Sequence, residues 1–142
     1  MKALDTNILV YAEMKNAPQH TRALEVLQGL AQGPAAWAIP WPCIYEMLRV
    51  ITHPRAFRVP IAPETALQDV KAILASPSLI LLSETPLHVE ILEQVVLQAG
   101  AKGNLMHDAH IVALCLEHGA TELITADRDF ARFRGLRITN PF

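Results

Sequence analysis

Two aspartates directly follow short apolar segments that have the composition of strands. Asp5 comes after Lys2–Leu4, and Asp127 follows Glu122–Thr125 after one intervening residue. Strand-like and helix-like segments alternate along the chain, so we expect a parallel sheet whose strands end along one rim. Because sites in such sheets form at the carboxyl ends of the strands, the two carboxylates are predicted to lie at the same rim.

Two further acidic residues occupy unusual positions in predicted helices. Within Cys43–Ile51 the only charge besides Glu46 is Arg49, so this helix is apolar nearly all round and Glu46 is expected to be buried. Asp108 is on the apolar stripe of its helix rather than on the polar face. The apolar residues that share this stripe stand three, four and seven positions on: Ile111, Val112 and Cys115.

Four carboxylates in partly apolar surroundings need a counter-charge, because burial of an unpaired charge is costly. Few basic residues are near them in the sequence: Arg49, Lys102 and Arg128. A divalent cation such as Mg²⁺ or Mn²⁺ takes carboxylate oxygens as ligands and keeps several waters. Such an ion activates water and stabilises charge on a phosphate, so the pattern indicates metal-assisted phosphodiester hydrolysis.

Each acid also has a structural explanation, which the sequence leaves open. Asp5 is able to cap the helix that follows it, and Asp108 suits the positive end of its helix dipole. Glu46 stands three positions before Arg49 and can pair with it, and Asp127 is a common type of turn residue. Only the four acids together, in their strand and helix context, indicate an active site.

The chain alternates between short apolar segments and amphipathic helices, without internal repeats. Strands are predicted at Lys2–Leu4, Ala36–Ile39, Leu79–Leu82, Glu122–Thr125 and Arg137–Thr139. Helices are predicted at Thr6–Glu13, Pro18–Leu30, Trp41–Thr52, Glu64–Ala75, Thr85–Ala99 and Asn104–His118. The continuous apolar run Leu79–Leu82 is typical of a strand covered on both faces. We expect a three-layer α/β fold, one domain over residues 1–142, with a mainly parallel central sheet flanked by helices.

The composition excludes several classes of protein. With 51% hydrophobic and 18% charged residues, the chain is not disordered. A net charge of −2 argues against a strongly basic nucleic-acid binder, although it leaves room for a local basic rim. Cys43 and Cys115 form no CxxC pair and are expected to be buried, reduced thiols. No apolar run is long enough for a membrane span and no secretory signal is visible, so we expect a cytoplasmic protein.

Four segments carry the acids in order along the chain. LDTNILVYA contains Asp5, IPWPCIYEMLRVITHPR contains Glu46, GNLMHDAHIVALCLEHG contains Asp108, and ELITADRDF contains Asp127. These segments resemble the motifs of the PIN-domain family, and specifically of its VapC-type toxins. The resemblance covers nearly the whole chain, and four segments in register are far more specific than a lone DTN.

The resemblance implies a metal-dependent endoribonuclease. It implies Mg²⁺ or Mn²⁺ held mainly by Asp5 and Asp108, with Glu46 and Asp127 completing the acidic pocket directly or through water. It further implies that a metal-activated water attacks an RNA phosphodiester in line. Family members vary at the fourth acid, so Asp129 remains an alternative to Asp127.

The resemblance also implies partners for the chain. It predicts the toxin of a toxin–antitoxin pair, a homodimer that is inhibited when a cognate antitoxin lays a peptide segment across the site. The resemblance also implies that Thr6 or Thr125 orients a carboxylate or the attacking water. The RNA target is not indicated by any motif.

Three other classes of protein compete with this interpretation. A haloacid-dehalogenase-like phosphatase has a second Asp two residues after the first, where this chain has Asn7. A receiver-type signalling domain has paired acids after its first strand and a Lys after a late strand, and ELITADRDF contains no Lys. A catalytically degenerate PIN-like interaction module is opposed by the intact set of four acids.

Histidines and arginines offer further candidate contacts. His107 and His118 are eleven positions apart, a rise of about 16 Å, so they cannot share a zinc ion. His107 and His110 need a ligand from elsewhere, and we favour satisfied surface or groove histidines. Some arginines are predicted to contact RNA phosphates, with solvated surface side chains as the alternative. These arginines form two clusters: Arg49, Arg55 and Arg58, and Arg128, Arg132 and Arg134.

Overall fold

The computed structural model describes residues 1–142 and contains one five-stranded sheet. The strands are β1 (Lys2–Leu4), β2 (Trp37–Pro40), β3 (Leu79–Leu82), β4 (Glu122–Ile124) and β5 (Arg137–Thr139). They lie in the order β3-β2-β1-β4-β5, and every neighbouring pair is parallel. The predicted parallel sheet is confirmed, and β1 and β4 are neighbours at its centre.

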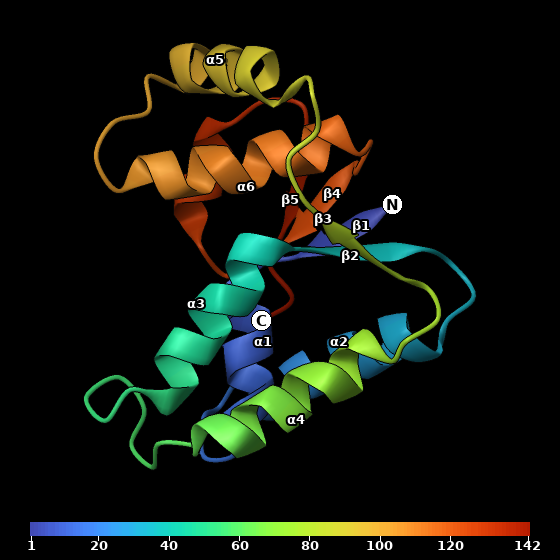
Figure 1. Ribbon diagram of the computed structural model, residues 1–142, viewed down its shortest axis with the longest axis vertical. Coiled ribbons are helices and arrows are strands. Elements are labelled where there is room, and N and C mark those ends of the chain that lie inside the picture. Colours follow the sequence, from blue (N-terminus) through green and yellow to red (C-terminus); the bar gives the residue numbers. More distant parts are fainter.

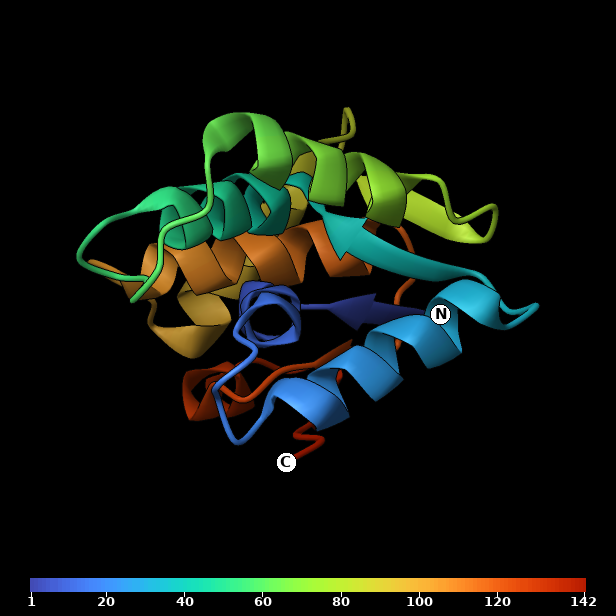
Figure 2. The same ribbon diagram turned by 90° about the horizontal axis from the view of Figure 1, so that it is seen from below.

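Six α-helices and one 3-10 helix surround the sheet. They are α1 (Thr6–Glu13), α2 (His20–Gln32), α3 (Trp41–Thr52), α4 (Pro63–Leu74), α5 (His88–Ala99), α6 (Leu105–Glu117) and η1 (Arg128–Arg132). α5 lies alongside α6 (Figure 1). α2 and α4 lie on opposite sides of β1 and β2 (Figure 2). The sheet is therefore the middle of three layers, which confirms the predicted fold class.

Local signals explain where several helices begin and end. The Asp5 carboxylate accepts the backbone N–H of Thr6 at 2.7 Å and so caps α1. α5 ends at Ala99, and the next residue, Gly100, adopts the left-handed conformation with φ of 61°. α3 ends at Thr52, and the next residue, His53, has the extended backbone favoured before a proline, here Pro54. These boundaries are encoded within a few residues of each helix end, so they agree with the sequence-based prediction.

The helix predicted from Thr85 begins three residues later, at His88. Thr85 accepts the backbone N–H of Leu87 on its hydroxyl at 3.2 Å, which makes a turn around Pro86. The three residues Glu84, Thr85 and Pro86 consequently form a connection between β3 and α5 rather than a first helical turn. This connection brings Glu84 close to α6, as described below.

β3 corrects one expectation from the sequence. Leu79–Leu82 is an edge strand that pairs only with β2, whereas its apolar run predicts a strand covered on both faces. Ile80 is 42% exposed, and only Leu82 of this strand is buried. An apolar run indicates a strand but contains no information on the order of strands in the sheet, which the other elements decide.

One hydrophobic core of 31 buried residues fills the space between the layers. Trp37 is fully buried in it, and its indole N–H donates to the hydroxyl of Ser76 at 3.3 Å. Cys43 and Cys115 are buried free thiols, as predicted. Burial raises the pKa of Cys115 to about 12 and that of Cys43 well above its ordinary value, so neither is a reactive thiolate. None of the helices combines the length and the apolar character that crossing a bilayer requires.

Candidate active site

A groove of about 1400 Å³ opens at the carboxyl ends of the strands. Its walls come from α1, α3, the β3–α5 connection, the start of α6 and the segment after β4. Six acidic residues line it: Asp5, Glu46, Glu84, Asp108, Asp127 and Asp129. The structure therefore brings together all four acids singled out from the sequence, and it adds the alternative fourth acid to the same groove.

Asp5 is the most tightly held of these acids, with 5% of its surface exposed. Its Oδ1 accepts the backbone N–H of Thr6, and its Oδ2 accepts the Thr125 hydroxyl and the Asn7 amide, each at 2.7 Å. Burial raises the pKa of Asp5, while the hydrogen bonds from Thr125 and Thr6 act to lower it. The helix-cap explanation is correct, and it is compatible with a site, because the carboxylate also lines the groove.

Asn7 is a site residue that the sequence does not single out. Its side-chain nitrogen donates to Asp5 and, at 2.9 Å, to the Thr125 hydroxyl. Its side-chain oxygen accepts the backbone N–H of Ala126 at 3.0 Å. Asn7 thus ties the start of α1 to the end of β4. Its position two residues after Asp5 is the signal that points to it, but the contact with β4 depends on the pairing of β1 with β4.

Asp127 and Asp129 flank the start of η1. The backbone N–H of Asp127 donates to the Thr125 hydroxyl at 2.9 Å, which links this acid to the Asp5 network. Asp127 Oδ1 accepts the backbone N–H of Asp129, also at 2.9 Å, so the predicted turn role is correct as well. One oxygen atom from each of Asp108, Asp127 and Asp129 lies within 4.8 Å of the others. Both candidates for the fourth acid are therefore next to Asp108.

Asp108 is half-buried in the first turn of α6. Burial raises its pKa to about 6, and repulsion from Asp127, Asp5, Asp129 and Glu46 acts in the same direction. Arg49, which pairs with Glu46, is the only Arg or Lys among the residues that line the groove. The group consists of carboxylate oxygens, which are the ligands preferred by Mg²⁺ and Mn²⁺, so the residues present fit such an ion.

Glu46 is exposed rather than buried, which corrects the expectation from its apolar helix. Its side chain is 48% exposed, because the buried stripe of α3 runs through other positions: Cys43, Ile44, Met47 and Ile51. Glu46 Oε2 accepts the Thr6 hydroxyl at 3.1 Å, and Oε1 lies 3.5 Å from a guanidinium nitrogen of Arg49. Glu46 therefore both pairs with Arg49, as the sequence allows, and lines the groove.

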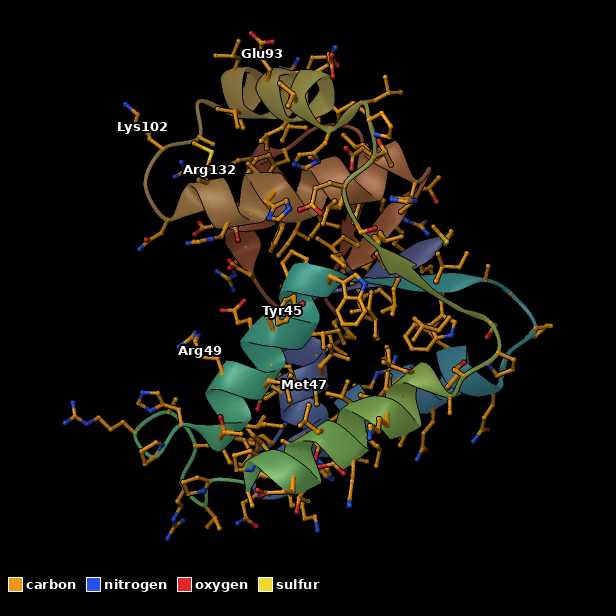
Figure 3. All side chains as sticks on the ribbon, in the orientation of Figure 1. Tyr45, Met47, Arg49, Glu93, Lys102 and Arg132 are labelled. Carbon is orange, nitrogen blue, oxygen red and sulfur yellow. The ribbon has the colours of Figure 1, made fainter.

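The rim of the groove is aromatic and partly basic. Tyr45, which is 67% exposed, lies 5.9 Å from Trp41 between ring centroids. Tyr45 and Arg49 extend from α3, whereas Glu93 lies on the distant α5 (Figure 3). Of the arginines considered for RNA contacts, Arg49 lines the groove and the others do not. Contact with RNA phosphates stays a prediction for all of them.

Comparison with known proteins agrees with this geometry. Residues 2–136 match the PIN domain. The chain is 33% identical to ribonuclease VapC48 of Mycobacterium tuberculosis, over 99% of this chain and 97% of that protein. The chain therefore belongs to the PIN-domain family and, within it, to the VapC ribonucleases. It is an endoribonuclease of the VapC toxin type, as the sequence predicts, rather than a phosphatase or a receiver domain.

Solved structures share the fold. A chain of VapBC2 from Rickettsia felis, bound to a DNA fragment from the promoter, has a TM-score of 0.70 and 21% identity, over 98% of this chain and 97% of that one. A chain of a toxin–antitoxin complex from Klebsiella pneumoniae has a TM-score of 0.65 and 20% identity, over 100% and 98%. At these identities the likeness extends to the fold alone.

Proposed function

We propose that this ribonuclease cuts RNA with a divalent cation, Mg²⁺ or Mn²⁺, bound at the acidic wall of the groove. The observation that carries the proposal is the convergence of six carboxylates on one groove in which Arg49 is the only Arg or Lys. The raised pKa of Asp108 is the expected result of burial and mutual repulsion among these groups. A bound cation would offset that repulsion, so the metal-free site favours the binding of a positive ion.

We assign Asp5 and Asp108 as the principal ligands, with Glu46 and Asp127 completing the site directly or through water. When bound, the ion supplies an activated water and stabilises the charge that develops on the phosphate. Thr125 and Asn7 keep the Asp5 carboxylate in one orientation through the hydrogen bonds described above. Asp129, like Asp127, has a carboxylate oxygen within 4.8 Å of one from Asp108, and we propose that both support the same ion.

We propose that the substrate enters along the rim formed by α3. Arg49 is exposed and pairs only loosely with Glu46, at 3.5 Å, so it is free to turn toward a phosphate. An overall negative charge disfavours RNA, which makes a local cation at the groove important. One bound divalent ion and Arg49 together supply the positive charge that the acids lack.

We propose that a cognate antitoxin covers the same groove. The similarity in fold to a chain of a toxin–antitoxin complex supports this partner. The exposed ring of Tyr45, beside Trp41 at the rim, offers an apolar anchor for a peptide segment. Tyr45→Ala is expected to weaken inhibition by the antitoxin, and Leu97→Ala, on the outer face of α5, is the matched control. The homodimer, the single-domain organisation and the cytoplasmic location stay predictions.

Cleavage of a mixed RNA pool tests the proposed chemistry. Wild-type protein freed of antitoxin is incubated with Mg²⁺, Mn²⁺ or EDTA, alongside Asp5→Asn and the matched control Glu93→Gln. We expect cleavage that requires the ion, persists in Glu93→Gln and is lost in Asp5→Asn, with weaker Mn²⁺ binding by calorimetry in that variant. Folded wild type that cuts no RNA under any condition would instead indicate a non-catalytic interaction module.

A further inference from the structure

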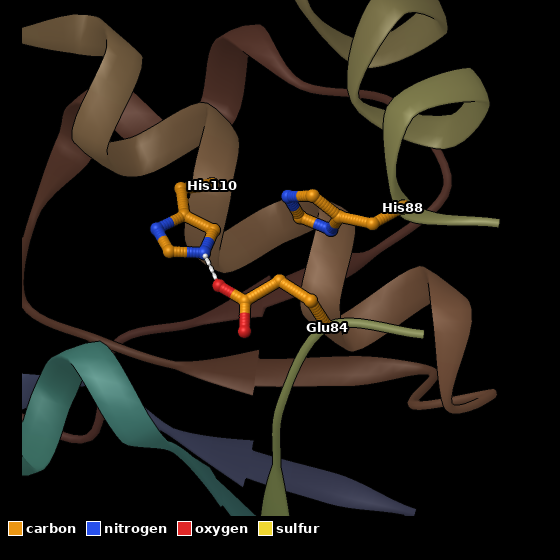
Figure 4. A group of neighbouring side chains, drawn as sticks. All are labelled: Glu84, His88 and His110. Carbon is orange, nitrogen blue, oxygen red and sulfur yellow. Dashed lines mark hydrogen bonds and ion pairs between the residues drawn. The ribbon is translucent and has the colours of Figure 1, made fainter. Parts of the chain in front are cut away.

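A second group of metal-ligand side chains lies beside the acidic groove. Glu84 follows β3 after one residue, His88 begins α5, and His110 is in the second turn of α6. The three side chains converge from these segments (Figure 4), and one ligand atom of each lies within 4.8 Å of the others. The sequence favours ordinary surface or groove histidines over a metal site at His107 and His110, whereas the structure places Glu84 and His88 next to His110.

His88 is oriented by a buried carboxylate. Its Nδ1 lies 2.8 Å from Oε1 of Glu117, whose side chain has no exposed surface. The second oxygen, Oε2, is buried and has no hydrogen-bond partner. A buried carboxylate with an unsatisfied oxygen is costly unless positive charge is close by. Protonated Nδ1 donates to Glu117, which leaves Nε2 of His88 available as a ligand, as in carboxylate–histidine–metal arrangements.

The other two side chains are also positioned by their surroundings. Nε2 of His110 lies 2.8 Å from Oε1 of Glu84, across the connection between β3 and α5. The chain just before Glu84 is held by His118, whose Nε2 donates to the backbone oxygen of Ser83 at 2.7 Å. The rings of His88 and His110 are 5.3 Å apart between centroids at an interplanar angle of 72°, so they do not stack face to face.

We propose that Glu84, His88 and His110 bind a first-row transition metal ion of the Zn²⁺ type, with Glu117 supporting His88. Two imidazoles and one carboxylate suit Zn²⁺, Co²⁺ or Ni²⁺, whereas Mg²⁺ prefers oxygen ligands. The acidic group around Asp108 has no nitrogen ligands, so the two sites differ in metal preference. This site does not depend on the proposed cleavage chemistry.

The geometry is close to that of a tetrahedral site. Zn²⁺ with bonds of about 2.0–2.2 Å places its ligand atoms about 3.4 Å apart. The present separations, from 2.8 Å to at most 4.8 Å, reach that value by small side-chain rotations. Three protein ligands leave a fourth position for water, and Glu84 and His110 both line the groove. The bound ion would connect β3, α5 and α6 and add positive charge to the groove wall.

Metal binding in the presence of excess Mg²⁺ tests this site. Zn²⁺ is titrated calorimetrically into the full chain, and Co²⁺ is followed by its visible absorption, which reports tetrahedral nitrogen and oxygen ligation. We expect one ion per chain at this site and a rise in Tm of about 5–10 °C at Zn²⁺ well above its Kd. His88→Gln and His110→Gln are each expected to weaken binding by about 10–100-fold or more.

Two matched variants make the result specific. His107→Gln removes a histidine of the same helix that is outside the group, and Asp108→Asn alters the acidic site; both should bind Zn²⁺ as the wild type does. Zn²⁺ affinity and Co²⁺ spectra that are unchanged in both His88→Gln and His110→Gln would overturn the proposal. So would the absence of any Zn²⁺ binding by the folded wild type. If His88→Gln does not fold, because Glu117 loses its partner, the half-buried His110 decides the question.

Discussion

The hydroxyl of Thr125 donates a hydrogen bond of 2.7 Å to Oδ2 of Asp5, and this contact joins the ends of β4 and β1. The backbone adds a second link, since the N–H of Asp5 donates to the oxygen of Ile124 at 3.1 Å. The Asp5 carboxylate is therefore fixed from both strands before any ion binds. Preorganisation of this kind lowers the cost of assembling a metal site.

Thr125→Val tests that orientation, because valine keeps the shape of threonine but has no hydroxyl. Loss of a buried hydrogen bond to a charged group is expected to cost about 1–3 kcal/mol of stability. We also expect RNA cleavage to fall by about 10-fold or more, as for other supporting contacts of metal ligands. Urea unfolding and single-turnover cleavage measure the two effects. Thr125→Ser, which keeps the hydroxyl, should remain near wild type; equal rates in the valine and serine variants would contradict this role.

Stability of the metal-free protein should depend on Asp108. Its pKa is about 6 in the folded protein and 3.8 as the ordinary value, so between these pH values the folded state binds more protons than the unfolded state. Stability contributed by the protonated form is complete below pH 3.8 and is lost as the pH rises toward 6. We expect Asp108→Asn to flatten this part of the pH–stability curve, measured by scanning calorimetry in EDTA.

The effect of Mg²⁺ on the Tm of the wild type and of Asp108→Asn tests whether Asp108 is a metal ligand. Above pH 6 the ion should raise the Tm of the wild type more than that of Asp108→Asn, because it binds the ionised carboxylates. Glu93→Gln, on the outer helix α5, should follow the wild type throughout. An equal Mg²⁺ effect on the wild type and Asp108→Asn would show that Asp108 is not a ligand.

Arg49→Ala should weaken RNA binding at low salt more than at high salt. If Arg49 contacts one phosphate, its removal lowers the slope of log affinity against log salt by about 0.7–0.9. The measurement uses uncleaved RNA with the Asp5→Asn protein as background. Arg22→Ala is the matched control, because Arg22 is also exposed and also pairs with a glutamate three positions away, Glu25. Unchanged affinity at all salt concentrations would rule out the contact.

Glu122 lies at the start of β4, at the end of the sheet opposite the groove. Its contribution to stability should have the opposite pH dependence to that of Asp108. Burial acts to raise its pKa, but hydrogen bonds from Arg137 and Thr139 hold it below 4.5. This stability is complete above pH 4.5 and is lost as the pH falls below it. We expect Glu122→Gln to be less stable at pH 7 yet to bind Mg²⁺ as the wild type does, by calorimetry. Weaker Mg²⁺ binding in that variant would mean that the sheet ends are coupled.

Most of the fold could be predicted because its signals are local. Asp5 stands directly after a strand and before a helix, Pro54 stops α3, and Gly100 stops α5. Asp5 and Asp127 meet because parallel strands of one sheet end on the same side, and Glu46 and Asp108 reach the same groove from helices α3 and α6. Such features depend on neighbours within one turn or one strand, and the alternation of strands and helices then fixes the class of architecture.

The missed features depend on contacts between distant segments. The edge position of β3 follows from the order of the strands, which an apolar run does not contain. Glu46 is exposed because the groove opens beside α3, although its helix is rich in apolar residues. Asn7 and the group of Glu84, His88 and His110 become recognisable only when segments separated by more than twenty residues are side by side. In each case the structural feature is decided by a residue that is distant in the sequence and close only in the folded protein.

The pairing of β1 with β4 has a consequence for the protein during its synthesis. Asp5 is made first, but the strand whose end holds it, β4, begins at Glu122. A nascent chain that has emerged only through β3 has Asp5 and Glu46 but lacks Asp108, Asp127 and the Thr125 hydroxyl. It cannot assemble the acidic site. The proposed active site is therefore complete only after Thr125 and Asp127 have been synthesised.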